Sequence, residues 1–168
     1  MIEHLILYEL TKKVLTMYGI SKEIKKDFSV LTTPSYGTIK PALRRLENSA
    51  CIRTQKSMSS GGRPSVYYAI TKSGQEEFKK LILMQPPENP IQFLPIARIK
   101  IVCAENINKQ EQKELFSMLK MQSENIALDI KKLQESSGLN FYQKMVFDNL
   151  ICEYNNFISL LEGLERAC

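Results

Sequence analysis

The sequence has little of the side-chain chemistry that enzymes and metal sites use. It has no tryptophan and a single histidine, His4, and its four cysteines are isolated: Cys51, Cys103, Cys152 and Cys168. This spacing does not match zinc or redox motifs, so we interpret each cysteine as a reduced, mostly apolar filler. No Ser/His/Asp set, carboxylate pair or phosphate-binding glycine loop is present. The sequence therefore predicts a protein that is not an enzyme and has neither metal nor cofactor.

Long apolar runs are also missing. No segment approaches the roughly 18–20 apolar residues that span a bilayer. The first ten residues carry acids and lack the basic start of a signal peptide, so they are interpreted as a helix. These absences predict a cytoplasmic protein with no membrane partner. At 168 residues, of which 43% are hydrophobic, the chain has room for one large or two small domains.

Charge is distributed unevenly along the chain. Residues 1–85 hold 14 Lys/Arg against 7 Asp/Glu, whereas residues 86–168 hold 9 against 11. A basic first half and a slightly acidic second half suggest that only the first half meets a polyanion. Three prolines within 86–90 forbid a continuing helix and mark a boundary. We therefore predict a first domain over residues 1–85 and a second over residues 91–168.

Three helices are expected at the start of the chain. Apolar spacing predicts the first over residues 2–14 and the second over residues 20–28. The third is expected to have Thr33 as its N-cap and Pro34 as its first residue. Pro41 lies inside its pattern and should bend it.

A β-hairpin follows the third helix. Residues 52–56 and 66–70 have strand patterns, and the loop between them is polar and glycine-rich. Thr71 is expected to cap a further helix that ends near residue 84. Helices followed by a basic hairpin are typical of a winged helix-turn-helix domain, whose third helix fits the major groove while the wing reaches backbone or minor groove.

Two segments resemble the PadR family of bacterial transcriptional regulators. Residues 37–47, GTIKPALRRLE, are similar to its recognition helix, and residues 61–74, GGRPSVYYAITKSG, to its Gly-Arg-Pro wing and the segment after it. The clear resemblance covers about residues 5–80. It implies a mainly α fold with a small β-hairpin wing: an N-terminal winged helix-turn-helix domain and a C-terminal α-helical dimerisation domain. It also implies a homodimer that binds a palindromic DNA operator, and a repressor released by a small, often aromatic effector.

The resemblance assigns DNA-contacting positions residue by residue. They are Tyr18, Ser35, Tyr36, Gly37, Thr38 and Lys40, with Arg63 at the wing. Arg44 is added because one of the two adjacent arginines on the helix should reach phosphate. Other roles stay open: Tyr18 packing between helices, and Tyr36 and Thr38 facing only solvent. Lys40 replaces the family's aromatic residue, and Met17 replaces a glycine, so the operator is expected to differ from the family's usual one.

The second half is predicted to be helical. One helix covers residues 91–103, with Pro95 in its first turn, and a long helix begins after Asn108 with Glu111 in a capping box and ends at residues 136–138. The last helix has an apolar seam at alternating spacings of three and four. Its members, predicted to form the dimer interface, are Phe147, Leu150, Tyr154, Phe157, Leu161 and Leu164. The alternative is a helical hairpin that covers its own apolar faces.

Two points about partners remain open at the level of sequence. Aromatic and methionine side chains that can line an effector pocket occur in both halves, although most suit an ordinary core. The basic domain also fits a different class of function, a winged-helix protein–protein module that docks an acidic partner.

Overall fold

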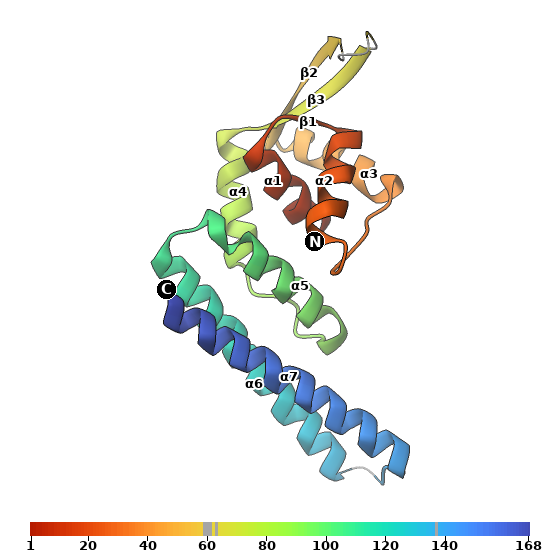
Figure 1. Cartoon of the computed structure of the whole chain (residues 1–168), viewed down its shortest axis with the longest axis vertical. Coiled ribbons are helices and arrows are strands. Elements are labelled where there is room, and N and C mark those ends of the chain that lie inside the picture. The colour runs from red at the N-terminus through yellow and green to blue at the C-terminus, as the bar shows by residue number, and fades with distance from the viewer. Residues whose placement is uncertain (59–61, 63, 137) are drawn as a thin grey trace. The chain divides into compact units, whose positions relative to one another are not determined.

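A computed structural model describes residues 1–58, 62, 64–136 and 138–168. It divides into two compact units, one of residues 1–84 and 98–106, the other of residues 85–97 and 107–168. Figure 1 shows a mainly helical chain with one small antiparallel sheet and two long C-terminal helices. The predicted fold class is therefore confirmed.

Among its described residues before 84, the first unit holds seven elements. They are α1 (Ile2–Lys12), β1 (Leu15–Thr16), α2 (Met17–Phe28), α3 (Tyr36–Asn48), β2 (Ile52–Met58), β3 (Pro64–Ile70) and α4 (Lys72–Leu83). Helix α1 is the centre of the core: Leu5, Ile6 and Leu7 are fully buried, and the helix packs on α2, α3 and α4. The ring of Tyr8 meets the ring of Phe28 edge-on, with centroids 5.2 Å apart.

The sheet has one strand more than the sequence predicts. Its order is β1-β3-β2, all antiparallel, and Leu15 pairs with Tyr68. Because β1 has only two residues, it is too short to show the alternation that identifies a strand. The first helix consequently ends at Lys12 rather than near residue 14, and the second begins at Met17, where the Thr16 hydroxyl caps the Gly19 amide at 3.1 Å.

The expected start of the third helix is wrong by two residues. Helix α3 begins at Tyr36 with Ser35 as its N-cap, not at Pro34 after Thr33. The backbone carbonyl of Ser35 accepts the first helical hydrogen bonds, from the amides of Thr38 and Ile39 at 3.0 Å each. Pro41 lies inside α3, as the sequence indicates.

Thr71 caps α4 as predicted and also anchors the base of the hairpin. Its hydroxyl accepts a hydrogen bond from the Gly74 amide at 3.0 Å and donates to the carbonyls of Ala50 and Cys51. Gly74 lies so close to this turn that an added Cβ would lie 1.9 Å from the Cys51 carbonyl oxygen. Only glycine fits this position without a shift of backbone.

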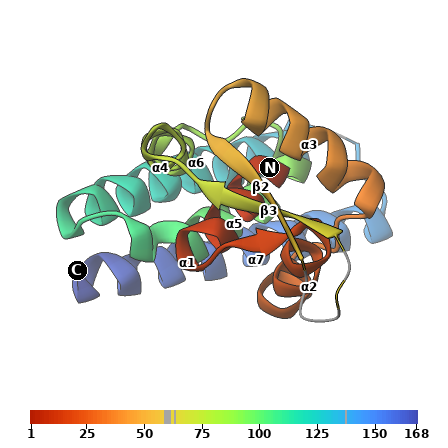
Figure 2. The ribbon, with the colours of Figure 1, turned by 90° about the horizontal axis from the view of Figure 1, so that it is seen from above.

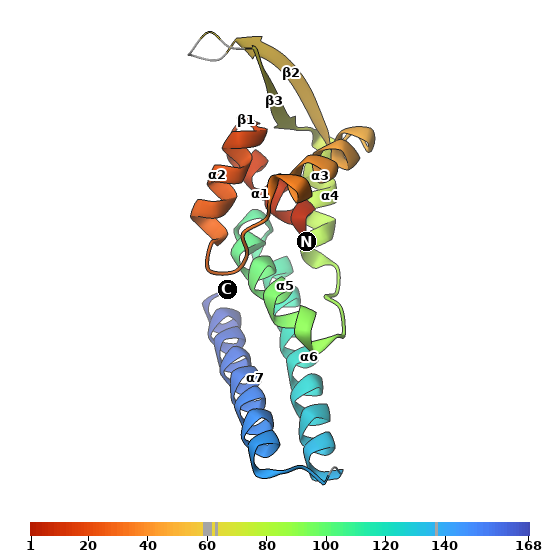
Figure 3. The ribbon, with the colours of Figure 1, turned by 90° about the vertical axis from the view of Figure 1, so that its right-hand side faces the viewer.

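The second unit is built on two long antiparallel helices, α6 (Lys109–Ser136) and α7 (Phe141–Ala167), which lie side by side in Figures 1 and 3. The capping box predicted at Asn108 and Glu111 is present: each side chain accepts the other residue's backbone amide, at 2.9 and 3.1 Å. A second capping box, between Asn140 and Gln143, starts α7.

Helix α5 (Pro90–Cys103) contributes to both units, because its residues 98–103, with the short 3-10 helix η1 (Ala104–Asn106), pack in the first. It begins at Pro90, so Pro95 lies inside it and not in its first turn. Within the first unit, the buried Lys100 ammonium donates hydrogen bonds to the carbonyls of Leu81 and Ile82 at the end of α4. Burial lowers the pKa of Lys100 to about 8. Residues 98–106 thus belong to the compact unit of the N-terminal elements, and the predicted domains 1–85 and 91–168 stay a prediction.

Part of the apolar seam of α7 is buried inside the second unit. Tyr154, Phe157 and Leu161 are buried; the Phe93 ring stacks on Tyr154 and meets Phe157 edge-on, with centroids 6.1 and 6.2 Å apart. The Tyr154 hydroxyl donates to the Pro90 carbonyl at 3.1 Å. These three side chains are therefore covered within the chain itself, as in the helical-hairpin alternative, and the dimer interface along the seam stays a prediction. The remaining seam members, Phe147, Leu150 and Leu164, are half-buried.

Candidate nucleic-acid interface

Helix α3 has one buried face and one exposed face. The buried face, Ile39, Ala42, Leu43 and Leu46, packs in the first unit. The exposed face carries the residues predicted to contact DNA: Tyr36, Gly37, Thr38, Lys40 and Arg44. Tyr36 leaves 47% of its surface exposed. The structure thus brings five of the eight predicted residues onto one solvent-facing surface, and Ser35 joins them as the N-cap.

The first turn of α3 is open to an anion. The Ser35 side chain makes no capping bond to the backbone of this turn; its hydroxyl instead lies 3.2 Å from that of Thr38. Helix N-termini present unpaired amides and a partial positive charge to solvent. A phosphate or a base edge at this position would meet both the amides and these two hydroxyls.

Gly37 has no packing reason to be glycine. A Cβ built there would meet only the Ser35 hydroxyl oxygen, at 3.5 Å, which is an ordinary contact. A glycine in the first two turns of a helix costs stability relative to alanine. Its presence on the exposed face is therefore consistent with a close approach by something outside the chain.

The two adjacent arginines of α3 have different surroundings. The Arg45 guanidinium pairs with the Glu3 carboxylate of α1, with Nε 3.0 Å from Oε1. Burial raises the pKa of Glu3, but the Arg45 hydrogen bond and charge, the backbone and the N-terminal ammonium outweigh it, so the pKa lies below its ordinary value. Arg44 is exposed and forms no ion pair with any residue that the structure describes. Arg44 is thus the arginine left available for a phosphate.

Tyr18 lies in the first turn of α2 and leaves 68% of its surface exposed. This exposure excludes the alternative role as a core tyrosine between helices. Helix α2 is held against the end of α1 by an ion pair between Lys13 and Glu23 at 3.0 Å and another between Lys12 and Asp27 at 2.6 Å. In Figure 2, α2 and α3 flank the hairpin in the view from above.

The wing is the hairpin of β2 and β3, which projects beyond the helices of its unit (Figure 1). Its register pairs Ile52 with Ile70 at the base and Met58 with Pro64 at the far end. Arg53 and Lys56 of β2 are exposed basic residues that were not among the predicted DNA contacts. Both lie on a predicted strand of the basic hairpin, and that position could have identified them. The predicted wing residue Arg63 lies outside the described residues.

A contact between α3 and β2 fixes the wing base. The Thr54 hydroxyl donates to the Glu47 carboxylate at 2.8 Å. Tyr67 and Tyr68 on β3 are both half-buried. Burial, with a smaller contribution from Glu47, raises the pKa of Tyr68.

A metal site and a membrane-spanning helix are both absent from the residues that the structure describes. No cluster of His, Cys, Asp or Glu in the described ranges is arranged to hold a metal ion. Likewise, none of the helices there is long and apolar enough to cross a membrane.

Comparison with known proteins identifies a family. The model of the transcriptional regulator PadR-like family matches residues 6–80. A PadR family transcription regulator from hypervirulent Clostridium difficile R20291 is 31% identical, over 47% of this chain and 80% of that chain, with a TM-score of 0.42. Bacillus subtilis PadR, solved in complex with operator DNA, is 19% identical over 99% of this chain and 97% of its own, with a TM-score of 0.48. Streptococcus mutans smu.1604c is 19% identical over 96% of both chains, with a TM-score of 0.46. No curated protein matches.

Proposed function

Because this chain belongs to the PadR-like family of transcriptional regulators, we propose that it acts as a homodimeric repressor that binds a palindromic DNA operator and is released by a small-molecule effector. The observation that carries the DNA-binding part is the exposed face of α3. It combines an open helix N-terminus, a glycine without a packing role, and basic side chains that have no partner within the described chain.

The proposed docking puts the first turns of α3 in the major groove. There Tyr36, Thr38 and Lys40 face base edges, with Gly37 allowing the duplex to come close. Arg44, one turn further along, binds phosphate. Tyr18, at the start of α2, and Ser35 contact the flanking backbone, since most protein–DNA hydrogen bonds go to phosphate and sugar.

The wing supplies a second, sequence-independent set of contacts. Arg63 is proposed to enter the minor groove or bind its phosphates, where the negative potential attracts arginine. Arg53 and Lys56, both exposed on β2, extend this basic surface toward the wing base. Each phosphate that is neutralised releases counterions, so binding is expected to weaken steeply as salt rises.

Dimerisation is proposed through the second unit. A patch of exposed apolar side chains lies where α6 ends and α7 begins: Leu133, Phe141, Tyr142, Met145 and Val146. We call it the apolar end patch. Exposed apolar side chains gathered in this way are typical of protein interfaces. The half-buried seam residues Phe147 and Leu150 continue the patch along α7, and a second copy of the chain is the proposed occupant. Two recognition helices then read two half-sites about one helical turn apart, or a multiple of it.

The test begins with selection of bound fragments from random DNA by the purified full chain. Affinity for the selected duplex is then measured by fluorescence anisotropy over a range of salt concentrations. Arg44→Ala should weaken binding to every duplex and reduce the slope of log affinity against log salt by about 1. Lys131→Ala, which removes one exposed charge from α6, is the matched control and should change neither quantity.

Gly37→Ala gives an independent test of close approach. Alanine in a helix should stabilise the fold by about 0.5–1 kcal/mol relative to glycine. DNA affinity should fall at the same time, because the added methyl group points at the duplex. If the variant is more stable and binds the selected duplex as tightly as the original chain, the proposed docking of α3 is wrong.

A further inference from the structure

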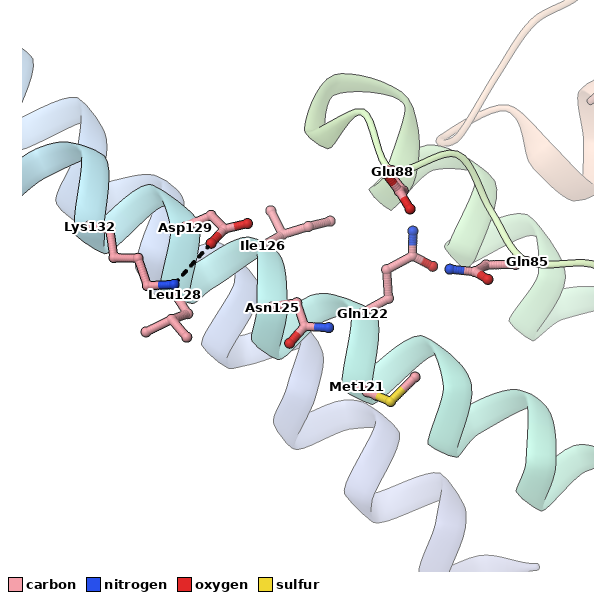
Figure 4. Close-up of a pocket in the computed structure, with 9 residues that line it drawn as sticks. All are labelled: Gln85, Glu88, Met121, Gln122, Asn125, Ile126, Leu128, Asp129 and Lys132. Carbon is pink, nitrogen blue, oxygen red and sulfur yellow. Dashed lines mark hydrogen bonds and ion pairs between the residues drawn. The ribbon is translucent and has the colours of Figure 1, made fainter.

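The second unit contains a pocket that the DNA-binding proposal does not use. It lies between the segment before α5 and the middle of α6, and its volume is about 360 Å³. Figure 4 shows side chains from both segments around it, with Gln85 and Glu88 on one side and Gln122, Asn125 and Asp129 on the other. The volume falls in the range of pockets that hold small organic ligands.

The most informative residue of the pocket is Gln122, which is only 5% exposed. Its amide nitrogen donates to the carbonyl oxygens of Pro86 and Pro87, each at 3.2 Å. Since both partners are acceptors, the amide orientation is fixed by chemistry. The other end, the Gln122 oxygen, is buried and accepts no hydrogen bond from any described residue.

An unpaired buried carbonyl oxygen is rare because it has lost water without gaining a donor. In Figure 4 the Gln122 side chain extends from α6 toward Gln85 and Glu88, on the other side of the pocket. A ligand that donates a hydrogen bond there would satisfy the oxygen. The oxygen is covered in this structure, so a donor reaches it when the side chains over it move aside.

The charges around the pocket add a preference for a cation. Its two carboxylates differ: Asp129 is paired with Lys132 of the same helix at 3.4 Å, whereas Glu88 forms no ion pair within the described chain. A positively charged donor would be attracted by Glu88, and an anion would be repelled by it.

The remaining walls are apolar. Met121 and Leu128 are half-exposed beside the polar groups, and Ile126 is buried beneath them. Such a surface suits a short hydrocarbon or aromatic group attached to the charged donor.

We propose that this pocket binds a small organic ammonium ion, whose N–H groups donate to the Gln122 oxygen and the Glu88 carboxylate while its apolar part lies on Met121 and Leu128. This assignment deepens the proposed function by naming the chemical class of its effector. Binding itself does not depend on DNA, so the two proposals can fail separately.

The experiment titrates the full-length, DNA-free protein with benzylamine and follows amide resonances by two-dimensional NMR at pH 7. Benzyl alcohol and benzoate, which keep the ring and remove or invert the charge, are the comparison probes. Saturable shifts of residues 85–88 and 121–132 are expected with benzylamine. Binding of benzyl alcohol should be at least about tenfold weaker, and benzoate should not bind.

Variants identify the groups responsible. Glu88→Gln, on an exposed side chain, should weaken benzylamine binding about tenfold or more, because it removes a charge-assisted contact. Glu124→Gln makes the same charge change on α6 outside the pocket and should leave binding unchanged. Gln122→Met, checked for an unchanged helical circular dichroism spectrum, should abolish saturable binding.

Three outcomes would overturn the proposal. They are the absence of saturable shifts at these residues, benzoate binding as tight as that of benzylamine, or equal weakening by Glu88→Gln and Glu124→Gln. Because no DNA is present, none of them bears on the docking of α3.

Discussion

The buried carboxylate of Glu9 predicts an unusual dependence of stability on pH. Glu9 lies on α1 with its side chain fully buried, and neither oxygen accepts a hydrogen bond from a described residue. Its nearest cation, the ammonium of Lys12, is 3.5 Å from one oxygen and also pairs with Asp27 at 2.6 Å. Burial raises the pKa of Glu9 to about 7, with Lys12 opposing the shift and Asp27 adding to it.

The direction in which stability changes with pH follows from which state, folded or unfolded, holds the Glu9 proton more tightly. The folded state keeps the Glu9 proton up to about pH 7, whereas the unfolded chain, with a pKa near 4.5, releases it earlier. The folded state therefore binds more protons between pH 4.5 and 7, and stability falls as pH rises through this window. At about 1.4 kcal/mol for each pKa unit, the loss between pH 5 and 8 is about 2–3 kcal/mol.

The perturbation is Glu9→Gln, which keeps the shape and removes the charge. The free energy of unfolding is measured in urea at pH 5, 6, 7 and 8 for both proteins. The difference in free energy of unfolding, variant minus original chain, should increase by about 2–3 kcal/mol from pH 5 to 8. Most of this increase should fall between pH 5 and 7. Taking the difference cancels the other titrating groups, such as His4, whose pKa is lowered by burial to about 4. Glu76→Gln, on the exposed face of α4, is the control. A difference between Glu9→Gln and the original chain that does not change with pH would refute the reasoning.

Three further changes test the packing of the first unit. Gly74→Ala should destabilise the fold by several kcal/mol, because the methyl group would lie 1.9 Å from the Cys51 carbonyl oxygen; thermal unfolding measures it. Lys100 has a pKa of about 8, below the usual 10.5, so stability should rise by about 2 kcal/mol from pH 7.5 to 9.5, and Lys100→Met should remove this rise in urea unfolding. Arg45→Ala should lower the free energy of unfolding by about 0.5–1 kcal/mol through loss of the half-exposed Glu3 pair, and high salt should reduce the difference.

Sequence reasoning succeeded where a local pattern decides the structure. The capping box of Asn108 and Glu111 and the Thr71 cap depend on neighbours within three residues, and the hairpin at residues 52–70 joins strands that are consecutive in the chain. The exposed face of α3 was likewise predicted by the spacing of Ile39, Leu43 and Leu46, because that spacing fixes which side chains face the core.

Sequence reasoning does not reach features that depend on contacts between residues far apart in the chain. The strand β1 exists because Leu15 pairs with Tyr68, more than fifty residues away. Phe93 packs on Tyr154 and Phe157 of the α7 seam, a contact within the chain that the spacing of the seam alone cannot predict. The unpaired oxygen of Gln122 depends on two proline carbonyls of another segment, so no sequence pattern indicates the pocket.

Thr71, together with the Thr54–Glu47 hydrogen bond, holds the base of the hairpin and so helps to set where the wing points. Thr71 joins Ala50, Cys51 and Gly74 into one turn, and each strand then runs seven residues outward. Seven residues of strand extend about 23 Å, so a rotation of about 5° at the turn displaces the far end by about 2 Å. That displacement is several times the range of about 0.5 Å in donor–acceptor distance that a hydrogen bond tolerates. Substitutions at position 71 should therefore change the direction of the wing, and with it the phosphate contacts that we propose for the wing.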